Sequence, residues 1–143
     1  MSSFKIFDIA GSGISAQSVR LNTVASNLAN ADSVSGDPAT VYKARHPVFQ
    51  AIQQQLQGAA SLENKSEATV RVAGIVESQA APQVRYDPGN PLANAQGNVY
   101  APNVNVIEEM TDMISASRAY QDNVEVMNTS KDLMLATLKL GQS

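Results

Sequence analysis

Side chains that could perform chemistry are few in this sequence of 143 residues, and none has a partner at catalytic spacing. His46 is the only histidine, and the chain contains no cysteine. This composition excludes disulfide bonds, thiolate catalysis, zinc–thiolate sites and multi-histidine metal sites. His46 lies between Arg45 and Pro47 without a second ligand or nucleophile nearby. We therefore expect it to be solvated or hydrogen-bonded.

The remaining candidate motifs are two acidic clusters and one glycine-rich segment. Glu108, Glu109 and Asp112 form the first cluster, and residues 122–125 hold the second. Both clusters fall in a long helical pattern, where acidic side chains usually form the solvated face. The Gly11-Ser12-Gly13 segment lacks the preceding strand and the following Gly-Lys-Ser/Thr of a phosphate-binding loop. We therefore predict no catalytic residue, no cofactor and no metal site.

Composition narrows the partners of the chain. The formal net charge is −3, which gives no electrostatic basis for binding nucleic acid. No segment approaches the roughly 20 apolar residues of a membrane span, so we expect no direct membrane insertion. The N-terminus lacks a basic region followed by an apolar core, so we expect no cleaved secretory signal. Aromatic residues make up only 5% of the chain, which predicts a thin core.

The first helix is predicted over residues 7–31, because seam positions recur at heptad spacing. One row is Phe7, Ile14, Leu21 and Leu28, and the alternating row is Ala10, Gln17, Val24 and Ala31. The flanking side chains are small, and a charged outer face is absent. We expect this helix to be covered by protein on several sides. So small a chain can hardly supply all of that cover by itself. Asn27 and Asn30, near its end, are equally consistent with C-capping and with packing.

The middle of the chain carries short strand patterns separated by turn residues. After a loop over residues 32–40 comes a mixed stretch over 41–52, in which residues 42–49 predict an edge strand broken at Pro47. Residues 53–61 predict a polar, flexible connection. Further strands are predicted over 69–77, where Gly74 indicates a bulge or a close approach, over 83–86, and at 99–100. Pro88 and Gly89 suit the central positions of a type II turn.

The second helix is predicted from Asn103 or Asn105 to Leu140, with two neighbouring stripes that suggest several partners. One stripe comprises Val106, Met110, Met113, Ser117, Tyr120, Val124, Met127, Lys131, Met134 and Leu138, and the other Ile107, Ile114, Gln121, Asn128 and Leu135. The expected fold is mainly α with a small β part, in which the terminal helices pair as a long coiled-coil hairpin. Residues 1–32 and 103–143 would form a discontinuous core domain, and residues 33–102 a short β-rich or irregular middle segment.

Several motifs resemble one known family, the bacterial flagellar basal-body rod proteins. The segments that carry the resemblance are 16–21 (AQSVRL), 25–31 (ASNLANA), 102–105 (PNVN) and 115–121 (SASRAYQ). Residues 86–91 (YDPGNP), the opening 6–12 (IFDIAGS) and the short length resemble the proximal-rod C type. The likeness extends over essentially the whole chain.

The resemblance implies a structural polymer subunit that is exported unfolded by the flagellar type III apparatus. Its terminal helices would form the inner coiled-coil layer of a hollow rod that crosses the periplasm and transmits torque. The implied partners are other copies of the chain, proximal and distal rod proteins, and adaptor proteins of the export gate and MS ring. A coiled-coil export chaperone, which would form a discrete dimer, and a small enzyme are the alternatives.

The residues predicted to form assembly contacts come from both helices. They are Phe7, Ile14, Leu21, Val24, Asn27, Leu28 and Asn30 in the first helix, and Val106, Ile107, Met110, Met113, Ile114, Tyr120, Val124, Met127, Met134 and Leu138 in the second.

Overall fold

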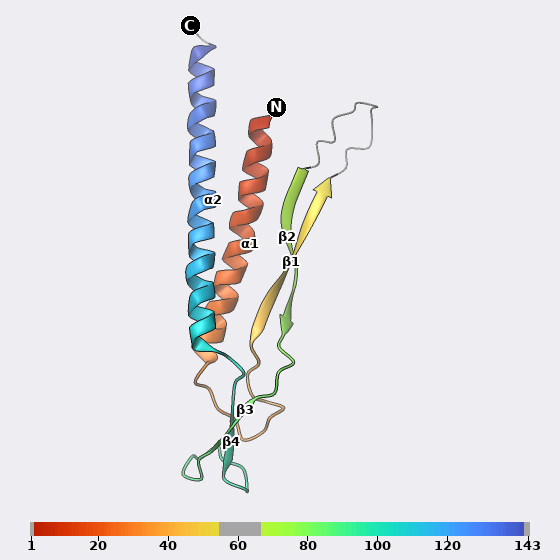
Figure 1. The fold of residues 1–143 in the computed structure, drawn as a ribbon, viewed down its shortest axis with the longest axis vertical. Helices are drawn as coiled ribbons and strands as arrows, with labels where there is room; N and C mark the ends of the chain where they lie inside the picture. The colour runs from red at the N-terminus through yellow and green to blue at the C-terminus, as the bar shows by residue number, and fades with distance from the viewer. Residues whose placement is uncertain (1, 55–66, 142–143) are drawn as a thin grey trace.

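A computed structural model describes residues 2–54 and 67–141, which form two long helices and two small antiparallel sheets (Figure 1). The elements follow the order α1 (Ser2–Asn30), β1 (Arg45–Gln54), β2 (Glu67–Glu77), β3 (Gln83–Tyr86), β4 (Asn98–Ala101) and α2 (Val106–Leu140). The mainly α fold with a small β part is confirmed, as is the pairing of the terminal helices.

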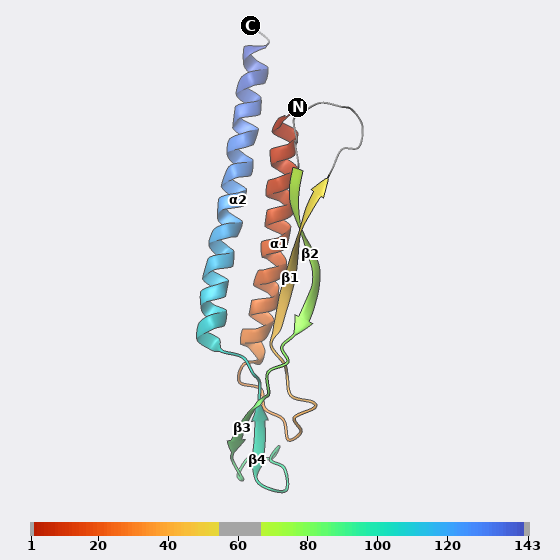
Figure 2. The same ribbon diagram turned by 45° about the vertical axis from the view of Figure 1, so that its right-hand side comes forward.

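The helices are antiparallel, and the β1–β2 hairpin lies along the opposite flank of α1 (Figures 1 and 2). Helix α1 is therefore the middle layer of three. The hairpin covers one side of α1, which explains in part why this helix lacks a charged outer face. The sequence does not predict that the chain itself provides this cover. Ser12 on α1 accepts a hydrogen bond from the backbone N–H of Val70 at 3.2 Å, which fastens β2 to the helix.

Strand β1 runs through Pro47 without a break, contrary to the sequence prediction. Pro47 pairs with Ile75 in a two-stranded sheet, where each strand has a free edge that needs no N–H donor. The bulge lies at Ala73, next to the predicted Gly74, because Val48 pairs with Gly74 and Phe49 with Val72. The extra residue reverses the alternation of side chains, so residue 76 faces the opposite side from residues 70 and 72. The predicted flexible connection begins inside β1, and its residues 55–61 lie outside the described residues.

Strands β3 and β4 pair below the adjoining ends of the two helices (Figure 1). Both lie where the sequence predicts strands. Residues 87–90 do form a turn, closed by a 3.2 Å hydrogen bond from the N–H of Asn90 to the carbonyl of Asp87. Gly97 is the glycine with positive φ in the described chain, at 77°. Gly89 therefore does not adopt the φ that a type II turn requires, and that prediction is wrong.

The core is small and consists of small side chains. The buried hydrophobic residues are Ala10, Ala16, Val24, Val41, Ala44, Val99, Ala101, Val104 and Ala116. Every one is alanine or valine. Four lie on α1 or α2, and the other five lie in β4 or in the segments that connect the helices with the strands. A core of this kind brings the backbones close together but removes little apolar area from water.

Candidate assembly interface

The seam between α1 and α2 is built from small and polar side chains. A Cβ atom added at Gly13 would lie 2.9 Å from Oδ1 of Asn123, so the helices approach closely there. Further along, the Arg20 guanidinium lies 3.1 Å from the Asp112 carboxylate. The α2 residues buried at this seam are Glu109, Ala116 and Ser130, which share a heptad row with Asn123. The closest contacts between the helices are therefore made by small and polar residues, and Met127 of α2 also reaches Gly11 of α1.

Asn27 is completely buried and makes four hydrogen bonds to three parts of the chain. Its Nδ2 donates to Oε1 of Glu109 at 2.9 Å and to the carbonyl of Arg45 at 2.8 Å. Its Oδ1 accepts from the N–H of Arg45 and from the hydroxyl of Tyr42, both at 2.9 Å. The packing alternative is therefore the correct one for Asn27, whose side chain joins α1 to α2 and to the start of β1.

Glu109 corrects the prediction that the first acidic cluster is solvated. Glu109 is only 6% exposed, and its Oε2 is buried without a hydrogen-bond donor among the described residues. Asp112 is paired with Arg20, as described above, and Glu108 alone of this cluster is exposed. The acids at 122 and 125 are exposed as expected. An incompletely satisfied carboxylate at a helix–helix seam is costly, so it calls for a physical reason.

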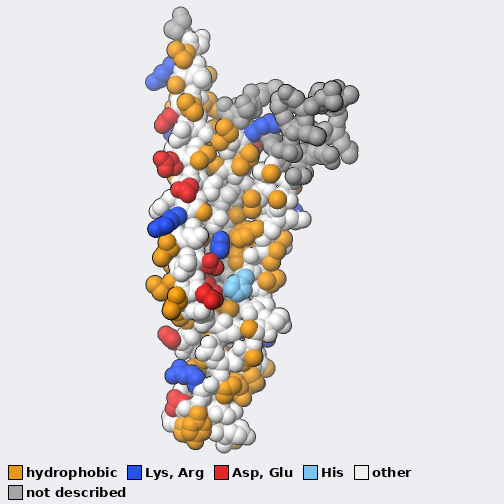
Figure 3. Space-filling view, in the orientation of Figure 1, with side chains coloured by type: hydrophobic (Ala, Val, Ile, Leu, Met, Phe, Trp, Pro, Cys, Tyr) orange, Lys and Arg blue, Asp and Glu red, His pale blue; other side chains and the backbone are white. Residues whose placement is uncertain are grey.

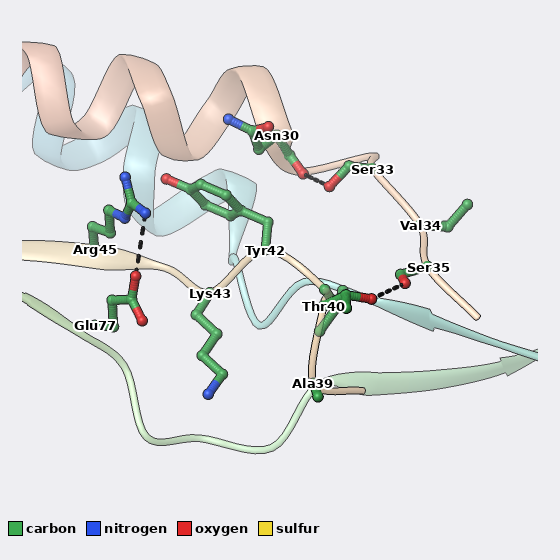
Figure 4. A pocket seen from close by; sticks show the side chains of 11 residues that line it. Asn30, Ser33, Val34, Ser35, Ala39, Thr40, Tyr42, Lys43, Arg45 and Glu77 are labelled. Atoms are coloured by element: carbon green, nitrogen blue, oxygen red, sulfur yellow. Dashed lines mark hydrogen bonds and ion pairs between the residues drawn. The ribbon is translucent and has the colours of Figure 1, made fainter. Parts of the chain in front are cut away.

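Tyr42 and Arg45 contact Asn27 from the loop and from the start of β1. Both side chains point towards the helices, whereas Lys43 points the opposite way (Figure 4). Burial raises the pKa of the Tyr42 phenol above its usual value of 10.0; Arg45 opposes this rise, and the carboxylates of Glu109 and Glu77 add to it. The Arg45 guanidinium lies 3.2 Å from Glu77 and 5.6 Å from the centre of the Tyr42 ring.

A polar cleft of about 500 Å³ lies beside this cluster, between the end of α1 and the start of β1. Of the three charged groups that line it, Arg45 and Glu77 are paired with each other, and the third, Lys43, points away from the helices (Figure 4). The hydroxyls of Ser35 and Thr40 are hydrogen-bonded together at 2.6 Å. The described residues contain no group of three or more His, Asp and Glu side chains that could hold a metal ion. The Ser35–Thr40 hydrogen bond and the Arg45–Glu77 ion pair hold the loop and the start of the hairpin together, so we interpret the cleft as structural.

Asn103 and Asn105 fix the other side of the junction. Asn103 accepts from the N–H of Ala44 and donates to the carbonyl of Ala80, both at 2.8 Å. Asn105 caps α2, and its Oδ1 accepts from the N–H of Ile107 at 3.1 Å. The start predicted for the second helix is thereby confirmed at Asn105.

Large apolar side chains remain exposed on both outer layers (Figure 3). On the first turns of α2 these are Val106, Ile107, Met110 and Ile114, of which Ile107 is 77% exposed. At the other end of α2 they are Leu133, Leu135, Leu138 and Leu140, and on the hairpin Val48, Phe49, Val70, Ile75 and Val76. None of the described helices is both long and apolar enough to cross a membrane. So many exposed apolar groups in one small chain mark interaction surfaces.

Comparison with known proteins matches both ends of the chain to rod protein families. Residues 7–36 match the family described as flagella basal body rod protein, and residues 95–140 match flagellar basal body rod FlgEFG protein C-terminal. Flagellar basal-body rod protein FlgC of Escherichia coli O157:H7 is 54% identical over 142 residues, covering 99% of this chain and 100% of that protein. The chain belongs to the FlgC family of flagellar basal-body rod proteins. FlgC of Salmonella typhimurium (strain LT2) is 51% identical with the same coverage, and FlgC of Aquifex aeolicus is 39% identical over 97% of both chains.

The residues predicted as assembly contacts occupy three kinds of position in this FlgC family member. Val24 and Asn27 are buried within the chain. The half-buried ones are Phe7, Ile14, Leu21, Leu28, Asn30, Met113, Tyr120, Val124, Met127 and Met134. The exposed ones are Val106, Ile107, Met110, Ile114 and Leu138. The half-buried and exposed residues have apolar surface available to a neighbour, whereas Val24 and Asn27 contribute to the fold of the FlgC chain itself.

Sequence reasoning missed Glu109, Tyr42 and Arg45 as members of the polar cluster. The available signal was the heptad row of Glu109, Ala116, Asn123 and Ser130, which runs parallel to the methionine stripe. Its members are small or polar, so a search for apolar periodicity does not detect the row. For Tyr42 and Arg45 no local pattern exists, because their role depends on contacts with α1, far away in the sequence.

Proposed function

We propose that this chain is a structural subunit of the proximal rod of the bacterial flagellar basal body. It would assemble with its own copies and with other rod proteins, through its terminal helices, into the hollow shaft that transmits torque. The observation that carries this proposal is that the side chains between the two helices differ in kind from those that stay exposed. Small and polar residues make the closest contacts between α1 and α2, while large apolar residues at both ends of α2 stay exposed. Membership of the FlgC family supports the same role.

The exposed surface of the chain is large enough for several neighbours. The chain exposes 10175 Å², whereas a compact monomer of its mass would expose roughly 7,000 Å². The excess of roughly 3,000 Å² is several times the ~800 Å² that one partner contributes to a standard interface. A discrete dimer, as expected of an export chaperone, would cover only part of this excess.

The positions of the apolar patches favour an open assembly. Apolar patches lie at both ends of α2 and on the hairpin, so one chain can contact different neighbours through different patches. Where such a contact is not reciprocated between the same two chains it is heterologous, and heterologous contacts that do not close a ring generate helical assemblies.

Within the assembly, residues 1–32 and 103–143 would form the inner helical layer and residues 33–102 the outer segment. The two family matches, over residues 7–36 and 95–140, contain most of α1 and α2, the helices that would form the inner layer. Further proposed partners are the distal-rod proteins, the export-gate and MS-ring adaptor proteins, and the flagellar type III apparatus that would export the chain into a rod spanning the periplasm.

The substitution Ile114→Asp tests this function. Ile114 is 54% exposed, so the fold of the chain tolerates a carboxylate there. In an assembled rod the same carboxylate would be buried without a partner, at a cost of several kcal/mol. With the variant as the sole copy in the cell, we expect its amount in purified basal bodies, and swimming, to fall sharply.

Thr129→Asp is the matched control, because residue 129 is exposed on the same helix and outside both apolar stripes. We expect it to assemble normally. Normal incorporation of the Ile114→Asp chain would contradict the proposed interface. Recovery of the unmodified chain with export substrates in the cytoplasm, and its absence from basal bodies, would support the chaperone alternative.

A further inference from the structure

Glu109 is an unusual residue for a buried helix–helix seam, because a carboxylate is costly to bury unless it is fully hydrogen-bonded. Around it the buried hydrophobic residues are alanine and valine, and its Oε2 is buried without a donor in the described part of the chain. Replacing a buried ionic or polar group by an apolar one of similar volume is often neutral or stabilising. The best-attested reason for retaining such a group is that it selects one register between helices.

The geometry around Asn27 is suited to that task. One amide binds the carboxylate of Glu109 on α2 and both backbone groups of Arg45 at the start of β1. Sliding α2 by one turn, about 5.4 Å, would break the bond to Glu109 and leave a buried amide N–H without an acceptor. The alanine, glycine and serine residues along the seam present similar small surfaces in neighbouring registers, so they select register only weakly. The Arg20–Asp112 pair at the same seam also favours the native register, but its side chains are 30% and 47% exposed, so water screens it.

We propose that the Asn27–Glu109 pair fixes the register of α2 against both α1 and the β1–β2 hairpin. Glu109 acts here as a positioning residue, through Asn27. The consequence for assembly rests on the proposed function. Without a fixed register, the exposed Ile107 and Ile114 on α2 would be displaced along the helix axis relative to the half-buried residues Phe7, Ile14, Leu21 and Leu28 on α1. A shift of one turn at each subunit would misalign both sides of a repeating interface.

A disulfide reporter can measure this register, because the native chain has no cysteine. A Cβ at residue 13 lies 3.0 Å from Cγ of Asn123, so Gly13→Cys and Asn123→Cys place two thiols opposite each other. A slip of one turn separates these positions beyond the Cβ–Cβ distance of about 4.5 Å that a disulfide tolerates. The disulfide yield after mild oxidation of purified basal bodies therefore reports the fraction of chains in the native register.

Three substitutions in this reporter chain separate register from stability. Glu109→Gln keeps an acceptor for Asn27, and we expect the parental yield. Glu109→Met removes the acceptor at similar volume, and we expect the yield to fall about threefold or more, since other registers then compete. Val24→Ala weakens the buried core without touching the pair, and we expect fewer incorporated chains at the parental yield per chain.

Exclusion of the Glu109→Met chain from basal bodies, while Val24→Ala and Glu109→Gln still assemble, would also support the proposal. The proposal would be overturned if the Glu109→Met chain were incorporated to the parental level and gave the parental disulfide yield. It would also be overturned if Glu109→Gln lowered the disulfide yield as much as Glu109→Met does. Either contrary result would leave the rod function untouched. Absence of the unsubstituted native chain from basal bodies would instead refute the proposed function.

Discussion

Tyr42 is the residue through which we expect alkaline pH to weaken the polar cluster. Its hydroxyl donates to Oδ1 of Asn27, and ionisation would remove that donor while placing a second negative charge near Glu109. Burial is the main cause of its raised pKa. Below pH 10.0, the phenol's usual pKa, both the folded and the unfolded chain hold the proton. Above this value the unfolded chain loses it first, so the stability contributed by the neutral phenol declines as pH rises through the folded-state pKa.

We therefore predict that raising the pH above 10 lowers the urea concentration that releases the chain from purified basal bodies. The drop should be smaller in Tyr42→Phe, which has no ionisable group at this position. Tyr86→Phe is the control, because Tyr86 is 75% exposed and should show the parental pH dependence. An equal drop in the parent and in Tyr42→Phe would show that other groups cause the alkaline sensitivity.

At the residue scale, sequence predicts types of side chain better than their partners. Asn27 was recognised as a position with two possible roles, and only the three-dimensional structure decides between them. Glu109 was assigned to a solvated face because acidic residues on long helices are usually exposed. Its burial depends on Asn27, 82 residues away, and no local pattern encodes so distant a contact.

At the scale of elements, the close approach of the two helices depends on Gly13. A side chain there must displace the Asn123 amide, whose Nδ2 donates to the carbonyl of Ala119 at 2.7 Å. We predict that Gly13→Val pushes the helices apart and destabilises the chain by about 1–3 kcal/mol, the usual cost of overpacking. The amount of the chain in purified basal bodies should fall accordingly.

The second substitution Asn123→Ala should restore part of this loss, because it frees the space that the introduced valine side chain needs. Gly74→Val is the control, since no atom lies within 4 Å of a Cβ added there. Equal losses from Gly13→Val and Gly74→Val would mean that the effect comes from the change of residue type and not from the helix–helix contact.

The helices were predictable because each carries a long periodic pattern and α2 has an asparagine cap. The strands were located correctly, but their details were not. Whether Pro47 breaks a strand depends on whether its backbone nitrogen faces the paired or the free edge of that strand. The place of the bulge depends on the register with β1. The hairpin's position against α1 was also unpredictable, because the Ser12–Val70 bond joins residues 58 positions apart.

At the scale of the whole molecule, the chain has too little core for its length. Apart from Pro102, the buried hydrophobic side chains of its described residues are alanine and valine, and α1 has neither acidic residues in its first turn nor basic residues in its last. Ordering one residue costs roughly 1–2 kcal/mol of backbone entropy. Methyl and isopropyl groups bury little area against that cost, so neighbours must supply much of the remaining stabilisation.

We therefore predict that the amide hydrogens of α1 and α2 exchange far faster in the isolated chain than in purified basal bodies. A factor of about 100 corresponds to about 2.7 kcal/mol of stabilisation by neighbours. Strand β4 provides the internal control, because Val99 is among the most completely buried side chains and Pro102, equally buried, follows the strand. Its protection should change less on assembly. Equal protection of both helices in a verified monomer and in the rod would mean that the thin seam suffices alone, and the exposed apolar stripes would then need another explanation.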